Sequence, residues 1–245
     1  FVRFPFLLYN GDENFVPPII KSEKSKIKVL AANETETISR YWYAEDNGKV
    51  KGRIAAHYRK NDPKGEAKFS NFDSENDTKI SELLFSVAEG WAKNQGAKRI
   101  HGPLGLTSFD RSGVLVEGYS YLPTAYSCYN KDYYDRLLIS SGYTKEFDWV
   151  EYSIEVPDYI PNKIIRGSQL VRNRYKVRLL EANSVRSIRK YKGQILEVLN
   201  AAYESLDNFT MLGKTEFDEV FDEFAKVIVP DLTAFIENSS GELIG

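Results

Sequence analysis

The sequence predicts a mixed α+β domain followed by the beginning of a second domain of the same kind. Residues 41–58 hold two runs of strand-forming residues around Asn47-Gly48, a dipeptide that favours the tight turn of a β-hairpin. Residues 78–95 place apolar side chains at the spacing of an amphipathic helix. The hairpin pattern then returns at 233–245. Strands and a helix in one layer, followed by a repeated hairpin, indicate an α+β fold in tandem.

The other elements follow from periodicity and from the residues that start or stop helices. Asp77 or Thr78 can cap the long helix, and Gly96 stands where its C-terminal cap is expected. The predicted apolar face of this helix is Ile80, Leu83, Leu84, Val87, Ala88 and Trp91. The rest of the first domain is predicted as strands at 67–72, 99–101 and 147–156, a helix at 132–141 and a loop at 104–123. The second is predicted as a strand at 175–180 and helices at 187–205 and 215–229.

The composition places the chain among globular proteins and excludes several kinds of site. Of 245 residues, 42% are apolar and 13% aromatic, and the formal net charge is −2. No apolar run reaches the roughly 18 residues of a membrane helix, so we expect a cytoplasmic protein without a membrane partner. One cysteine, Cys128, and two histidines exclude an internal disulfide and a multi-thiolate zinc site, and we expect no metal. The chain starts with Phe and ends within a predicted strand, so we expect a fragment.

Charge is strongly segregated along the chain. Residues 161–192 hold ten basic residues and one acid, whereas residues 193–245 hold eleven acids and two lysines. Such a basic stretch can follow a phosphate backbone. It can also be a solvated linker and helix face that the acidic helix at 215–229 neutralises. Because the basic run lacks interleaved aromatic residues for base stacking, we favour the second interpretation and expect no nucleic-acid partner.

Several segments, taken in order, resemble the GNAT acyl-CoA N-acyltransferase superfamily. They are Gly48-x-Val-x-Gly-Arg-Ile-Ala-Ala56 at the hairpin, Trp91-Ala-Lys-Asn-Gln-Gly-Ala-Lys-Arg-Ile100 after the long helix, and Tyr133-Tyr-Asp-Arg-Leu-Leu-Ile-Ser-Ser-Gly-Tyr143. Four further motifs look more narrowly like bacterial proteins with two such domains in tandem: Val16-Pro-Pro18, His101-Gly-Pro103, Gly113-Val-Leu-Val-Glu-Gly118 and Tyr129-Asn-Lys-Asp-Tyr-Tyr134.

The resemblance implies both the domain organisation and the activity. A GNAT-like domain, running strand, two helices, hairpin, strand, long helix, strand, helix and strand, would occupy residues 1–158. A basic linker would follow at 159–174, and 175–245 would be the first half of a second such domain. The intact protein would be an acyl-CoA-dependent N-acyltransferase that uses acetyl-CoA or another acyl-CoA and a small-molecule or peptide amine. Half a domain leaves helix faces without a sheet, so we expect self-association into a homo-oligomer.

One departure from the superfamily pattern concerns the cofactor. In the superfamily the turn before the long helix reads Arg/Gln-x-x-Gly-x-Gly/Ala, whose glycines let backbone N–H groups bind the CoA pyrophosphate. Here the turn is Asp73-Ser-Glu-Asn-Asp-Thr78, with three carboxylates and no glycine. We therefore expect this fragment to bind acyl-CoA poorly and not to be catalytically complete. The alternatives are a non-catalytic ligand- or partner-binding module on the same fold and, with less support, a tRNA-dependent aminoacyl transferase that binds RNA through 161–192.

Tyrosines are the main candidates for a site. The superfamily often uses a tyrosine as the acid for the leaving thiolate; that position is Leu138 here, and Tyr134, one helical turn earlier, is the nearest substitute. Packing in the core is the competing role for Tyr134. The candidate substrate-binding residues are Tyr119, Tyr126, Tyr129 and Tyr133, in a loop that can instead fold back on the core. Caps, turns and packing account for the remaining candidates, which are Glu45, Asp73, Glu75, Asp77, His57, His101 and Cys128.

Overall fold

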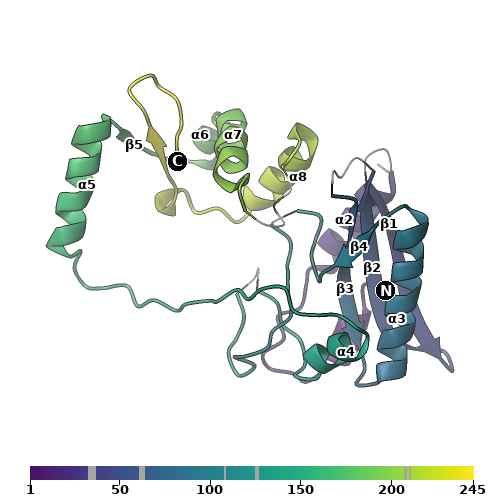
Figure 1. Ribbon diagram of the computed structural model, residues 1–245. Coiled ribbons are helices and arrows are strands. Elements are labelled where there is room, and N and C mark those ends of the chain that lie inside the picture. Colours follow the sequence, from purple (N-terminus) through teal and green to yellow (C-terminus); the bar gives the residue numbers. More distant parts are fainter. Residues whose placement is uncertain (33–36, 61–63, 108, 125–126, 207–208, 210) are drawn as a thin grey trace. The chain divides into compact units, whose positions relative to one another are not determined.

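The computed structural model describes residues 1–32, 37–60, 64–107, 109–124, 127–206, 209 and 211–245. It divides into two compact units, Phe1–Phe147 and Asp148–Gly245 (Figure 1). The domain boundaries at 158 and 174 that the sequence suggested stay predictions.

The first unit is a four-stranded sheet with helices against it. Strands β1 and β2 and strands β2 and β3 pair antiparallel, while β4 pairs parallel to β3 after the crossing helix α3. The elements are α1 (Phe4–Leu8), α2 (Ile20–Ala32), β1 (Thr37–Asp46), β2 (Lys49–Arg59), β3 (Glu66–Ser74), α3 (Thr78–Asn94), β4 (Arg99–His101) and α4 (Tyr134–Ser140). Two helices, hairpin, strand, long helix, parallel strand and helix is the GNAT-like order, so the predicted mixed α+β fold is confirmed. Among the described residues, the first and last strands of that order are not formed.

The predicted hairpin is formed, and its turn lies where the sequence placed it. Asn47 and Gly48 have positive φ angles of 49° and 76°, between the paired ends Asp46 and Lys49. Both residue types tolerate this conformation, which the right-handed twist of the flanking strands requires in a two-residue turn.

Helix α3 begins and ends as predicted, but its buried face differs. Asp77 is the N-cap and its side chain accepts the Lys79 N–H, while Gly96 follows the C-cap with a φ of 94°. The buried residues are Ser81, Leu84, Phe85, Ala88 and Ala92. Of the predicted face, Leu83 is 57% exposed and Val87 is 37% exposed. Compared with the prediction, α3 is rotated about its own axis so that Phe85 faces the sheet, with its ring centroid 5.3 Å from that of Phe69 and 4.6 Å from that of Phe72 of β3.

The two faces of the sheet differ in character. The face under α3 and α4 is apolar: Ile54 of β2 and Phe69 of β3 are fully buried there, as is Leu137 of α4, which packs against them. The other face carries buried polar side chains, among them His57, whose ring nitrogens lie 2.8 Å from Ser39 Oγ and 2.7 Å from Ser70 Oγ. The sheet therefore separates a hydrophobic core from a buried hydrogen-bonded layer.

The strand predicted at 147–156 is wrong. This segment has no regular secondary structure, and Tyr152, Ile154 and Val156 are 81%, 83% and 92% exposed. Alternation of apolar residues fixes which way side chains point in a strand, but a strand also needs an edge to pair with. One edge strand of the sheet, β4, is only three residues long and offers few backbone groups for pairing.

The second unit is smaller and its sheet has two strands. Strands β5 and β6 pair antiparallel, and an isolated bridge from Glu237 to Leu243 continues β6 into the predicted second hairpin, whose turn contains Gly241 with a φ of 84°. The elements are α5 (Asn162–Tyr175), β5 (Arg178–Glu181), α6 (Val185–Arg189), α7 (Lys192–Tyr203), α8 (Lys214–Phe224), a 3-10 turn (Pro230–Leu232) and β6 (Ala234–Glu237).

Two expectations for this unit need correction. The strand predicted at 175–180 begins only at Arg178, because helix α5 extends to Tyr175; the segment 159–174 is thus mainly helical, and its role as a linker stays a prediction. The helix predicted at 187–205 is two helices, because Ser184 and Ser187 form a reciprocal capping box that starts the short α6 before α7.

Candidate functional site

A buried cluster of ionic and hydroxyl groups lies where β3 ends, beside the start of α3. Asp73 of β3 and Arg53 of β2 are 8% and 6% exposed, and Arg53 Nε donates to Asp73 Oδ2 over 2.7 Å. Tyr134 of α4 and Tyr9, which follows α1, complete the cluster and are 2% and 3% exposed. Four separate elements thus bring their side chains together at one end of the sheet.

The Tyr134 hydroxyl is the centre of this hydrogen-bond network. It donates to Asp73 Oδ1 over 3.1 Å and accepts from the Ser74 N–H over 3.3 Å. The Tyr9 hydroxyl lies 2.8 Å from it and 3.2 Å from Asp73 Oδ1. Each buried polar group therefore has a partner inside the protein, as folded proteins require.

The environment makes Tyr134 a weak acid. Burial, then the charge of Asp73, then Tyr9 raise its pKa well above the ordinary value of 10. A general acid works best when its pKa lies near the working pH, so these surroundings favour a structural hydrogen bond over proton donation to a thiolate. The catalytic role of Tyr134 stays a prediction. In the structure Tyr134 is packed in the core, which is the position that the competing role requires.

The N-terminus of α3, where the fold would hold a CoA pyrophosphate, does not fit that group. All three carboxylates of the 73–78 turn are engaged locally. Asp73 pairs with Arg53, Glu75 lies 2.9 Å from Lys51 Nζ, and Asp77 Oδ1 accepts the Lys79 N–H over 2.9 Å. An anion here would meet three negative side chains and would compete with Asp77 for a helix N–H group.

The tyrosine loop is folded back on the first unit. The Tyr119 hydroxyl donates to the Leu115 carbonyl, that of Tyr129 to Asp12 Oδ1, and that of Tyr133 to the Ser74 carbonyl, each over 2.8 Å. All three side chains are half-buried. Tyr126 lies outside the described residues. The structure does not gather the three described tyrosines around one opening, and their roles in substrate binding stay predictions.

The histidines and the cysteine occupy packed positions. Burial lowers the pKa of His57 to about 4, so its ring is neutral between Ser39 and Ser70 at neutral pH. His101 is 7% exposed, and burial also lowers its pKa. The Cys128 thiol donates to the Ser112 carbonyl. Within the described ranges, no group of three or more His, Cys, Asp or Glu side chains is arranged to hold a metal ion.

Two members of the cluster, Arg53 and Tyr9, were not singled out from the sequence. Arg53 follows the hairpin glycine Gly52 and has the ordinary appearance of a basic residue on a half-exposed strand. Tyr9 is 64 residues from Asp73, so no local pattern connects them. One signal was present: an aspartate at a strand end requires a cationic or hydroxyl partner if it is buried.

The first unit therefore has a GNAT-like fold in which the turn before α3 carries three locally engaged carboxylates and no glycine. No family model matches the chain. Two curated proteins are similar to it: protein YghO of Escherichia coli, 28% identical over 242 residues, and the bacterial ceramide synthase of Caulobacter vibrioides, 23% identical over 257 residues. The matches cover 96% and 100% of this chain but only 61% and 65% of those proteins. The chain thus spans less than two thirds of either relative.

Solved acetyltransferase structures also show similarity. The aminoglycoside acetyltransferase meta-AAC0020, from an uncultured soil metagenomic sample and bound to sisomicin, is 13% identical with a TM-score of 0.38, covering 64% of this chain and 86% of that one. AAC(6')-Iy, bound to the bisubstrate analogue CoA-S-monomethyl-acetylneamine, is 9% identical with a TM-score of 0.38, covering 63% of this chain and 89% of that one.

In the part of the chain that the structure describes, no helix is both long and apolar enough to span a bilayer.

Proposed function

We propose that this chain is part of a longer acyl-CoA-dependent N-acyltransferase, and that its first unit is not the part that binds the acyl-CoA. The observation that carries the first half is the similarity of the whole chain to a protein named bacterial ceramide synthase, together with the GNAT-like order of elements. A ceramide is an amide of a fatty acid and a long-chain amine, so its synthesis is an N-acyl transfer. The amine acceptor of this protein is left open, as a small molecule or a peptide.

The second half rests on the N-terminus of α3. A cofactor pyrophosphate needs free backbone N–H groups and a site without negative charge. The Asp77 side chain accepts the N–H of Lys79, the second residue of α3, and Glu75 and Asp73 immediately precede the helix. Acyl-CoA bound elsewhere in the intact protein, by another copy of the fold, is compatible with both observations.

Isothermal titration of acetyl-CoA and of a long-chain acyl-CoA into the 245-residue chain tests the second half. We expect no saturable heat in the micromolar range, because the turn offers like charge to the pyrophosphate. Micromolar binding that weakens on Lys51→Gln, which leaves Glu75 without its cation, would place the cofactor at this turn and contradict the proposal. The matched control is Lys93→Gln, an exposed lysine in the last turn of the same helix, at the end away from the 73–78 turn.

The first half is tested on the protein that contains this chain in full. Released CoA thiol and a new amide, detected by mass spectrometry with acyl-CoA and a panel of amines, would support it. No thiol release with any amine would favour the non-catalytic binding module, for which the blocked α3 terminus is also the supporting observation. The two tests are independent, because the intact protein can be an active acyltransferase even if the first unit does not bind the cofactor.

A further inference from the structure

Helix α5 has an apolar stripe that none of the described residues of the second unit buries. Ile164, Val171 and Tyr175 are 60%, 47% and 61% exposed, and none of the helix's residues is buried. Their spacing of seven and four residues places them on one face of an α-helix. Leaving three large apolar side chains in water along a helix is costly, so this face is suited to an apolar surface outside the unit.

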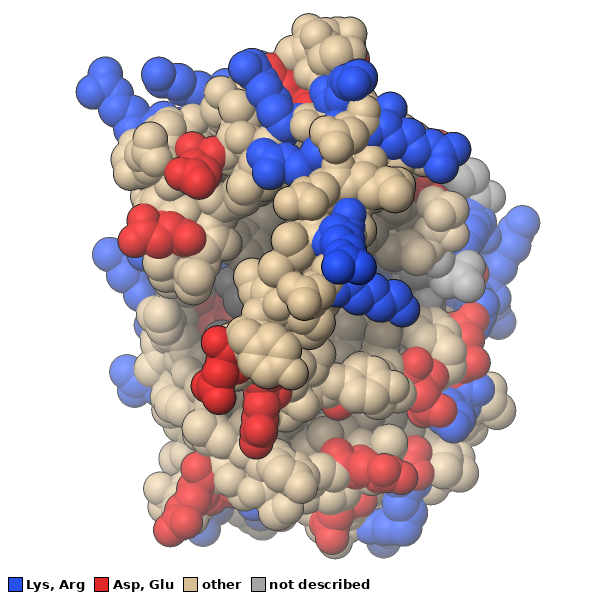
Figure 2. All heavy atoms as spheres, turned by 90° about the vertical axis from the view of Figure 1, so that its left-hand side faces the viewer, with Lys and Arg blue, Asp and Glu red and all other residues tan. Residues whose placement is uncertain are grey.

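Basic residues line both sides of this stripe. At 100° per residue, Lys163 and Arg174 lie on one side of it and Arg172 on the other, and Arg166 lies on the far side of the helix. No acid occurs between Asp158 and Glu181. Figure 2, which views the molecule from the side that carries α5, shows Lys and Arg side chains projecting from the surface there. The helix therefore combines an apolar stripe with two flanks on which all charged residues are basic.

No acidic side chain that the structure describes neutralises the positive charge of α5. Over the described residues, none of its four basic side chains forms an ion pair. Later basic residues behave differently: Arg189 pairs with Asp222 at 2.8 Å and Lys192 with Asp218 at 2.7 Å, both on α8. Among the described residues, the sequence-based expectation that α8 neutralises the basic segment thus holds for Arg189 and Lys192 and not for the basic residues of α5.

We propose that α5 binds the surface of an anionic membrane, lying in the plane of the headgroups with Ile164, Val171 and Tyr175 inserted. A helix with low overall hydrophobicity, one apolar stripe and flanking Lys and Arg is the type that lies in this interface. Anionic lipid attracts each basic residue near the surface, which complements the unpaired charge of α5. The inference goes beyond the proposed function and needs no activity to test it.

Other occupants fit the helix less well. A nucleic acid would use the charge, but its bases would stack on aromatic residues, and the stripe is mainly aliphatic. A second copy of α5 packed face to face would bring two positive flanks together. This proposal departs from the expectation of no membrane partner, which rested on the lack of a spanning segment. The predicted self-association would use other surfaces and is measured separately by light scattering.

Vesicle co-sedimentation of the full chain is the test. Vesicles of equal parts phosphatidylglycerol and phosphatidylcholine are expected to bind it, and vesicles of phosphatidylcholine alone to bind far less. The double variant Arg172→Gln/Arg174→Gln is expected to weaken binding about thirtyfold, since each basic residue near an anionic surface contributes about a fivefold gain in affinity. Ile164→Ser/Val171→Ser keeps all charges and is expected to abolish insertion, seen as loss of binding at high salt.

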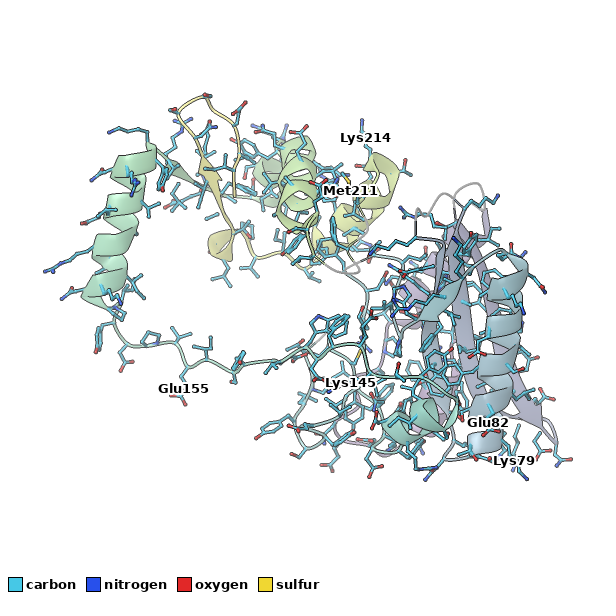
Figure 3. All side chains as sticks on the ribbon, viewed as in Figure 1. Lys79, Glu82, Lys145, Glu155, Met211 and Lys214 are labelled. Atoms are coloured by element: carbon cyan, nitrogen blue, oxygen red, sulfur yellow. The ribbon has the colours of Figure 1, made fainter. Side chains whose placement is uncertain are left out.

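The matched control removes the same charge elsewhere. Lys79 and Lys214, both exposed and labelled in Figure 3, lie on α3 and α8, and Lys79→Gln/Lys214→Gln is expected to bind vesicles like the unaltered chain. Equal losses in the control and the arginine variant would overturn the proposal, since net charge alone would explain them. So would an absence of binding to anionic vesicles at low salt. Binding of tRNA that the arginine variant loses and the Ile164/Val171 variant keeps, without vesicle binding, would assign the helix to RNA.

Discussion

Helices α3 and α5 are both amphipathic, yet α3 buries its apolar side chains against a sheet and α5 leaves its own in solvent. Leu84 and Phe85 of α3 are each 1% exposed, whereas Leu170 of α5 is 62% exposed. The difference comes from what lies beneath each helix, because α3 crosses from β3 to a parallel neighbour and must lie on the sheet. Helical periodicity thus shows that a face needs a partner, and topology decides whether the chain itself supplies it.

The largest expected difference between the two helices is in the stability lost when an apolar side chain of each is truncated. Phe85→Ala removes a ring packed against Phe69, Phe72 and Tyr143, and large core truncations of this type cost about 3–5 kcal/mol of unfolding free energy. Leu170→Ala in α5 is expected to change stability by less than about 0.5 kcal/mol. Urea denaturation followed by the fluorescence of Trp42 and Trp91, which pack together in the first unit, measures the first effect. Circular dichroism follows the second, and equal losses would contradict the comparison.

The next largest expected effect is a dependence of the unfolding free energy on pH, which comes from His57 on the polar face of the sheet. Burial lowers the pKa of His57 to about 4 from an ordinary 6.5, so the unfolded chain binds the proton more tightly than the folded one. Stability is therefore complete above about pH 6.5 and falls as the pH drops toward 4, by roughly 3 kcal/mol. His101, whose pKa burial also lowers, acts in the same direction.

The chain has two histidines, so NMR titration of their ring protons resolves both. A His57 resonance that titrates near 6.5 in the folded protein would contradict the buried position. His57→Gln should reduce the loss of stability between pH 6.5 and 4 if it folds, and the titration stands whether or not that variant folds.

The smallest expected effect concerns one hydroxyl. Tyr134→Phe removes the donor to Asp73 and leaves a buried carboxylate oxygen with fewer partners, a change that costs about 1–3 kcal/mol. Tyr121→Phe, at a side chain 76% exposed, is the control and is expected to have no measurable effect. An unchanged melting temperature for Tyr134→Phe, together with weaker ligand or substrate binding, would instead support the recognition role inferred from the sequence.

Local signals in the sequence predicted most of the first unit. Asn47-Gly48, Asp77 and Gly96 each act through their own backbone conformation or cap, so their effects can be recognised without knowledge of the fold. The unit boundary, the face of α3 and the absence of a strand at 147–156 depend on which surfaces meet, and no window of sequence contains that information. Helix α5 was missed because its density of basic residues suggested a linker, although its apolar spacing was already helical.

The candidate site was predicted less completely than the fold. Asp73 and Tyr134 were named for separate reasons, and the structure places them in one network, 61 residues apart in sequence. Arg53 could not be assigned to it, since a basic residue on a strand is as often exposed as paired. The acidic turn before α3, by contrast, could be recognised directly from the residue types at 73–78, which are three carboxylates and no glycine; that it does not bind acyl-CoA stays a prediction.

The hydrogen bonds from Ser39 through His57 to Ser70 join β1, β2 and β3 in a single chain. Hydrophobic contacts on the opposite face are non-directional, and a strand displaced by two residues would keep an apolar side chain in most of the same places. The same displacement would remove both partners of a fully buried imidazole. The polar layer therefore selects one alignment of the three strands over its near alternatives, and so provides the fidelity of assembly that the hydrophobic core alone does not.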